Sequence, residues 1–203
     1  MSHVLKIFLK IIQARIYRKC EACLSDTQFG FRSGMGTREA LFSIQVLIQR
    51  CRDVSVDVYA CFIDYQKAFD RVKHNKLVEI LLELGLDGKD VRIIERLYWN
   101  QSASVRVDGH NTANIEIQRG VRQGCVLSPL LFNIYSERIF SEALDGKTEG
   151  ILLNGEVVNN LRYADDTVLL ANTEEDLQEL INCVVAKSEE AGLELNIKRL
   201  KSS

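Results

Sequence analysis

Two adjacent aspartates, Asp165 and Asp166, lie in the middle of an otherwise apolar run at 161–170. A carboxylate buried inside a strand costs several kcal/mol unless a partner neutralises its charge. A tight turn between two short strands would present both side chains at its tip, and a divalent cation would neutralise them. Paired acids are also common in surface turns, so the pair alone leaves a plain turn and a metal site open.

A third carboxylate, Asp64, directly follows a run of β-branched and aromatic residues at 57–63 that predicts a strand. If the two strands are neighbours in one sheet, all three carboxylates meet at its edge. Mg²⁺ prefers such oxygen ligands, takes few protein carboxylates and keeps waters and substrate phosphates. Two ions about 3.5–4 Å apart clamp the attacking and leaving oxygens in phosphoryl transfer. The three histidines are isolated in the sequence, which disfavours serine-triad and zinc-hydrolase sites.

The N-terminal region that must support these strands begins with an amphipathic helix, followed by a loop and a second helix. No run is long and apolar enough to span a bilayer, and basic residues interrupt any signal-like core. The loop at 24–37 can hold phosphate beside Arg32 and Arg38, although ordinary helix entry explains it equally well. Thr37 is the predicted N-cap of the second helix. The predicted apolar faces are Val4, Leu5, Phe8, Leu9, Ile12 and Ile16, then Ala40, Leu41, Ile44, Leu47 and Ile48.

The rest of the chain alternates helices and strands. We expect four helices, at about 75–84, 89–98, 129–144 and 174–191. Gly85 would end the first of them in the left-handed conformation. Ser128 and Thr173 would be the N-caps of the last two. A hairpin of 104–109 with 113–117 turns at Asp108-Gly109. Further strands are expected at 151–153, 157–163, 167–171 and 193–197. The hairpin-like pairs predict an α+β fold, with an antiparallel sheet and helices on one face.

Charge and cysteine content add two weaker observations. Residues 1–52 hold nine Lys or Arg and three Asp or Glu, a net charge of +6, whereas the whole chain carries −2 and the remainder therefore −8. This asymmetry suits a protein that holds a polyanion on one part and cations on another, but a solvated basic helix would look the same. Cys20 and Cys23 have metal-type spacing without a second pair, so reduced thiols in an intracellular protein are the favoured interpretation.

Three segments, in this order, resemble successive palm motifs of reverse transcriptases, above all those of non-LTR (LINE-type) retrotransposons. They are FIDYQKAFDRV at 62–72, RGVRQGCVLSPLLFN at 119–133 and YADD at 163–166. The resemblance covers nearly the whole chain. It implies an RNA-directed DNA polymerase that uses an RNA template, a DNA primer, deoxynucleoside triphosphates and two Mg²⁺ (or Mn²⁺) ions.

Carried over position by position, the resemblance assigns roles to ten residues. Asp64, Asp165 and Asp166 would be the catalytic, metal-binding acids. Phe69 matches the aromatic gate that excludes a 2′-hydroxyl, and Tyr65, Gln123 and Gly124 match nucleotide-binding positions. Gln28 and Arg32 lie in a segment that resembles one contacting template or triphosphate, with a structural loop as the alternative. Arg122 faces either nucleic acid or solvent.

The resemblance implies one reverse transcriptase domain over 1–203 that is truncated at both ends. Palm would comprise about 57–71 and 121–203, and partial fingers about 1–56 and 72–120. The Arg-Pro-Ile-type segment that precedes the loop in this family is absent, and Arg199-Leu200 replaces the usual Lys-Thr pair. We expect the thumb and endonuclease regions to belong to a longer parent polyprotein.

Two other functions are weighed against the polymerase. One is a catalytically silent relic or nucleic-acid-binding scaffold derived from such an element, although all three acids are intact. The other is an RNA-dependent RNA polymerase, which Ala164 before the acid pair and Phe69 at the gate disfavour. The family implies a nuclear location and no membrane partner.

Overall fold

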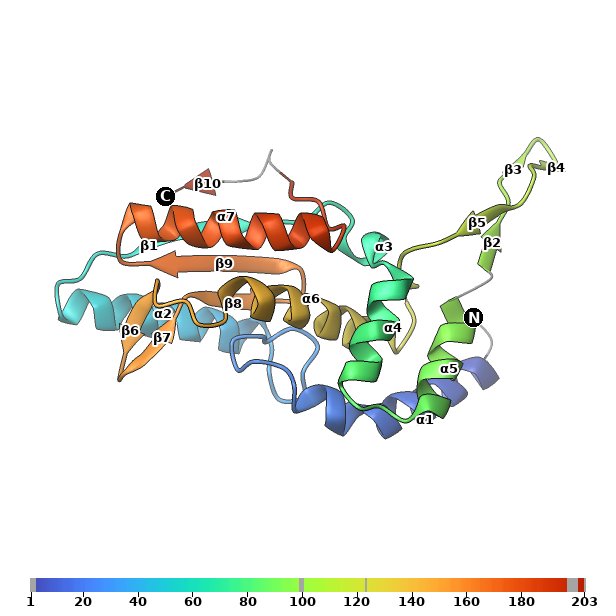
Figure 1. The fold of residues 1–203 in the computed structure, drawn as a ribbon, viewed down its shortest axis with the longest axis horizontal. Helices are drawn as coiled ribbons and strands as arrows, with labels where there is room; N and C mark the ends of the chain where they lie inside the picture. The colour runs from blue at the N-terminus through green and yellow to red at the C-terminus, as the bar shows by residue number, and fades with distance from the viewer. Residues whose placement is uncertain (1–2, 99–100, 123, 197–200, 203) are drawn as a thin grey trace.

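A four-stranded antiparallel sheet forms the centre of the computed structural model, which describes residues 3–98, 101–122, 124–196 and 201–202. The strand order is β10-β1-β9-β8, where β10 is Lys201–Ser202, β1 is Tyr59–Ile63, β9 is Asp166–Ala171 and β8 is Asn160–Tyr163. The strands β1 and β9 pair directly, with Ile63 opposite Thr167. The predicted neighbourhood of the two acid-bearing strands is therefore confirmed (Figure 1).

Helices α6 (Ser128–Leu144) and α7 (Glu174–Glu190) cover one face of this sheet. Successive side chains of a strand point to opposite faces, so Ile63 and Leu169 join the large core with these helices. Val168 and Leu170 point to the other face, where Leu47 of α2 (Thr37–Asp53) packs in a smaller cluster. The predicted α+β fold is confirmed, and α2 adds a helix on the second face.

Three more helices extend the large core: α1 (His3–Glu21), α4 (His74–Glu83) and α5 (Gly88–Tyr98). Within α1 the buried residues are Leu9, Ile12, Ile16 and Cys20. Val4 and Phe8 were expected on the same face but are 78% and 41% exposed. The buried residues of α1 are spaced by three and four positions, and this spacing, continued toward the N-terminus, reaches Leu5. Val4 and Phe8 therefore lie at the border of the apolar stripe. No helix in the described ranges is long and apolar enough to cross a membrane.

The predicted hairpin forms, but as two short ladders instead of one. Strands β2 (Gln101–Ala103) and β5 (Ile115–Ile117) pair at its base, and β3 (Arg106–Val107) and β4 (His110–Asn111) pair at its tip. Asp108 and Gly109 adopt φ of 49° and 83°, the positive values that a two-residue Asp-Gly turn requires. The hairpin projects away from the rest of the molecule (Figure 1).

Two predicted helix caps are wrong, and two helix-end predictions are confirmed. Helices α2 and α6 begin at Thr37 and Ser128, with Gly36 and Leu127 as caps. The Ser128 hydroxyl donates instead to the carbonyl of Arg122, at 2.6 Å. Thr173 caps α7 by accepting from the Asp176 amide, as predicted. Gly85 ends α4 with φ of 68°, also as predicted.

The C-terminal region differs most from the prediction. Strands β6 (Ile151–Leu153) and β7 (Glu156–Val158) form a separate two-stranded sheet. The strand expected at 193–197 is reduced to one bridge between Leu195 and Tyr65, and Ile197 lies outside the described residues. The segment 194–196 instead continues alongside the chain just beyond β1, where the Gln66 amide donates to the Glu194 carbonyl at 2.7 Å. This placement brings it to the acidic edge.

Candidate active site

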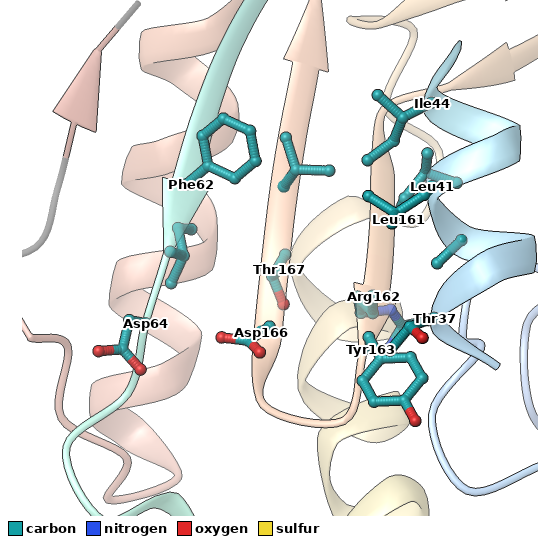
Figure 2. Close-up of a pocket in the computed structure, with 13 residues that line it drawn as sticks. Thr37, Leu41, Ile44, Phe62, Asp64, Leu161, Arg162, Tyr163, Asp166 and Thr167 are labelled. Carbon is teal, nitrogen blue, oxygen red and sulfur yellow. The ribbon is translucent and has the colours of Figure 1, made fainter. Parts of the chain in front are cut away.

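Asp64, Asp165 and Asp166 come together at one end of the sheet. Asp64 directly follows β1, and Asp166 begins β9 opposite Tyr163 of β8. In Figure 2 the carboxylates of Asp64 and Asp166 face each other across the two neighbouring strands. Asp165 occupies the two-residue turn between β8 and β9, after Ala164. Antiparallel pairing therefore gathers three acids from two distant segments.

The surroundings of Asp165 raise the pKa of its carboxyl above the ordinary aspartate value. Burial is the main cause that raises the pKa of Asp165, and a backbone hydrogen bond opposes it. The negative charges of Asp166 and Asp64 raise the pKa further. An opposite charge placed among the three would relieve this repulsion.

A divalent cation fits this donor set as an open site. Among the described residues, no three Asp, Glu, His or Cys side chains are close enough to hold a metal ion by themselves. Mg²⁺ and Mn²⁺ bind oxygen ligands, and Mg²⁺ commonly takes only one or two protein carboxylates. Water and phosphate oxygens complete the shell. Two facing carboxylates and a third beside them meet that requirement.

The metal-free protein should be more stable when Asp165 is neutral. The raised pKa means that the folded state binds this proton more tightly than the unfolded state, so ionisation above that pKa lowers the free energy of unfolding. Asp165→Asn should therefore raise the melting temperature at pH 7 in chelator. The gain should disappear as the pH falls below the ordinary aspartate range. Thermal melts from about pH 3 to pH 8 test this, because the series must pass below the ordinary aspartate pKa, and a lower melting temperature at pH 7 would contradict it.

A pocket of about 420 Å³ lies beside Asp64 and Asp166, between α2 and the uncovered part of the sheet. Leu41 and Ile44 of α2 line one side, and Phe62 of β1 lines the other (Figure 2). Its size is within the range of ligand sites. The acids therefore border a cleft large enough for a substrate.

Asn196 fixes the position of Asp64, although no motif in the sequence singles it out. Its side-chain amide donates to the Asp64 carboxylate at 3.0 Å, and its backbone amide donates to the Asp64 carbonyl at 2.8 Å. The two groups are 132 residues apart in the chain. The pattern at 193–197 predicted only a strand, so it indicated pairing in a sheet and did not indicate a contact with Asp64.

Phe69 belongs to a row of aromatic rings that leads to the turn at Ala164 and Asp165. It lies in the short helix α3 (Ala68–Arg71), half-buried, and stacks on Phe132 of α6 with ring centroids 4.4 Å apart. Phe31 contacts it edge-on at 6.2 Å, and Phe31 in turn lies 6.5 Å from Tyr163. The contacts with Phe132 and Phe31 thus hold the Phe69 ring in place.

The loop after Arg119 returns to Phe69. The amides of Gly120 and Val121 donate to the carbonyls of Val72 and Phe69, both at 2.8 Å. Gly120 has φ of 99°, and a Cβ there would meet the Asp70 carbonyl oxygen at 3.0 Å, so glycine permits this close approach. Gly124 also has positive φ and is exposed, whereas Gln123 lies outside the described residues.

Two residues expected near nucleotide or template have inward-facing side chains. Tyr65 is buried, and its hydroxyl pairs with Ser188 of α7 at 2.8 Å. Burial raises the pKa of this phenol to about 12. The Arg122 guanidinium donates to the Leu97 carbonyl at 3.0 Å and to the Gln101 side chain at 3.2 Å. Arg122 thus faces protein, which neither alternative for it had anticipated.

Gln28 and Arg32 are likewise bound within the protein. Gln28 has no exposed surface. Arg32 forms an ion pair with Glu21 at 2.8 Å and donates to the Ser25 carbonyl at 2.7 Å. Both side chains therefore have the contacts expected of a structural loop. Their contact with template stays a prediction.

Comparison with known proteins gives the same family as the motifs. The family model described as "Reverse transcriptase (RNA-dependent DNA polymerase)" matches residues 1–203. A Pol polyprotein from retrotransposable element R2 of Nasonia vitripennis is 31% identical over 96% of this chain and 18% of that protein. The RNA-directed DNA polymerase from mobile element jockey of Drosophila funebris is 30% identical over 83% of this chain and 18% of that protein.

A solved structure shows the same fold at low sequence identity. An apo telomerase from Candida tropicalis, truncated from its C-terminal domain, matches with a TM-score of 0.74. The match covers 96% of this chain and 40% of that one, at 14% identity. The chain spans less than a fifth of the R2 and jockey relatives named above. With the family model matching from end to end, the chain belongs to the reverse transcriptase (RNA-dependent DNA polymerase) family.

Proposed function

We propose that this chain is the nucleotidyl-transfer module of a retrotransposon reverse transcriptase. It extends a DNA primer on an RNA template by joining deoxynucleoside triphosphates to the primer 3′-hydroxyl. The observation that carries the proposal is the meeting of Asp64, Asp165 and Asp166 at one sheet edge in a chain of this family. Because catalysis of phosphoryl transfer is mostly positioning and charge stabilisation, such an edge needs few other groups.

Asp64, Asp165 and Asp166 would hold two Mg²⁺ or Mn²⁺ ions. Bound there, the ions would supply positive charge that activates the primer hydroxyl and stabilises the departing pyrophosphate. The carboxylates orient the reacting groups, and Asn196 keeps Asp64 in place through its two hydrogen bonds. The wall of the pocket away from the acids is formed mostly by apolar side chains, including Leu41, Ile44 and Phe62, and a less polar surrounding strengthens charge interactions.

Phe69 would act as the gate against ribonucleotides. Its stack on Phe132 prevents the ring from retreating, so a 2′-hydroxyl at that position would meet a fixed surface. The loop held against Phe69 would carry Gln123 and Gly124 to the incoming nucleotide. The Tyr65 hydroxyl is hydrogen-bonded to Ser188, so Tyr65 would contact the nucleotide through its backbone.

The parent protein would supply what lies outside this module. The R2 relative of Nasonia is a Pol polyprotein, and this chain covers 18% of it. We propose that thumb and endonuclease regions of such a polyprotein hold the duplex and prepare the target, and that the site of action is the nucleus.

Primer extension on a defined RNA template tests the proposed function. The chain, alone and joined to a thumb from its parent, should extend a DNA primer with deoxynucleotides in Mg²⁺ and stop in chelator. Extension that prefers ribonucleotides would identify an RNA-dependent RNA polymerase. Binding of primer and template by a thumb-joined protein that never extends would identify a silent scaffold.

A further inference from the structure

The segment Thr27–Gly30 is bound to the catalytic turn as a short extra strand. The amide of Phe29 donates to the carbonyl of Arg162, and the amide of Arg162 donates to the carbonyl of Thr27, both at 2.8 Å. These bonds form a parallel bridge at Gln28 along β8. The segment, named here the clamp, therefore lies directly against the strand that leads into the two acids.

Gln28 reaches from the clamp to the turn itself. Its side-chain oxygen accepts from the Ala164 amide at 3.0 Å and from the Gly30 amide at 2.9 Å. Its side-chain nitrogen lies 3.5 Å from the Ala164 carbonyl. Ala164 has φ of 60°, a left-handed conformation that residues with a Cβ adopt rarely. The buried side-chain amide of Gln28 thus binds Ala164, the turn residue whose backbone conformation is the least favourable.

Close packing leaves the clamp no room to shift. A Cβ at Gly30 would lie 2.3 Å from the Ala164 nitrogen, far inside contact distance. On the other side, Asn133 of α6 donates its side-chain amide to the Gly30 carbonyl at 2.7 Å. Arg32 donates to the carbonyl of Gln28 at 3.1 Å. The clamp is therefore fixed between the turn, α6 and its own following residues.

We infer that Gln28 is a positioning residue that holds the Ala164 turn so that Asp165 and Asp166 point at the substrate phosphates. The inference rests on the proposed function for its catalytic consequence. The buried side chain lies behind the turn and makes no contact with the cleft, so it acts through the turn backbone. Misplacement of reacting groups by about 1 Å costs roughly a hundredfold in rate. Loss of this grip should reduce kcat and leave the KM for nucleotide nearly unchanged.

Two variants separate the grip from general packing. Gln28→Leu keeps the volume and removes the acceptor, and Gln28→Asn keeps polarity but is too short to reach Ala164. Gln178→Leu is the matched control, because it removes a side-chain hydrogen bond to Asn182 on the exposed face of α7. Residue-resolved hydrogen exchange of the Ala164 amide is the first readout, and steady-state primer extension is the second.

In Gln28→Leu and Gln28→Asn, the Ala164 amide should exchange at least tenfold faster, while the core amide of Leu169 stays protected. Their kcat should fall roughly ten- to a hundredfold. Gln178→Leu should match the unmodified chain in both readouts. Unchanged Ala164 exchange, or loss of protection throughout the core with kcat per folded molecule intact, would overturn the inference. If the unmodified chain extends no primer, the proposed function fails, and the exchange data still decide whether Gln28 holds the turn.

Discussion

Primer extension should fall by roughly a thousandfold or more in Asp165→Asn, and to a similar extent in Asp64→Asn. Each change removes one negative charge from the edge that would hold the divalent cations, while the side-chain shape stays nearly the same. Single groups that stabilise transition-state charge contribute about 10²–10³ in rate, and loss of a metal ligand disturbs more than one such contact. The measurement is single-turnover extension of a DNA primer on RNA.

Asp57→Asn is the matched control for this prediction. Asp57 is an exposed acid just before β1, at the end of the strand opposite Asp64. Its replacement changes the net charge equally and should leave extension unchanged. Folding of the catalytic variants can be verified by thermal melting. Activity of Asp165→Asn close to that of the control would show that this carboxylate is no metal ligand.

Phe69→Ala should admit ribonucleotides. The ratio of kcat/KM for deoxynucleotide to that for ribonucleotide should fall by roughly ten- to a hundredfold, the range expected when one steric contact in a pocket is lost. The change also removes the ring stacked on Phe132, so part of the core loses its packing. Replacing a buried Phe by Ala costs about 3–5 kcal/mol, and the cost here should be smaller because Phe69 is only half-buried.

Competition between matched nucleotide pairs separates selectivity from stability, because both nucleotides are tested on the same folded molecules. Phe42→Ala removes an aromatic ring that is 64% exposed on α2, and it should leave the ratio unchanged. If Phe69→Ala lowers both rates in parallel and keeps their ratio, the ring supports the loop at Gly120 and does not select the sugar.

Local patterns were enough to predict most of the elements. A run of β-branched and aromatic residues predicted β1, an apolar run predicted β9, and the Asp-Gly pair predicted the hairpin turn, because these signals depend on residues close in the chain. The cap predictions were wrong at Thr37 and Ser128, because each helix begins at that residue, and Gly36 and Leu127 occupy the cap positions. In its described part, the strand expected at 193–197 was wrong, because Leu195 forms a single bridge with Tyr65 while Leu193 is buried in the large core.

The sequence by itself determined the family and the identity of the acids, because each motif is a continuous run whose residue types carry the chemistry. The tertiary structure decided which groups support them. Asn196 meets Asp64 across 132 residues, and Gln28 meets Ala164 across 136, so neither pairing leaves a periodic trace. For Gln28 the resemblance implied contact with template or triphosphate, with a structural loop as the alternative, and its buried side chain lies against the turn backbone. A polar residue in a loop suits either role, and only its three-dimensional neighbours distinguish them.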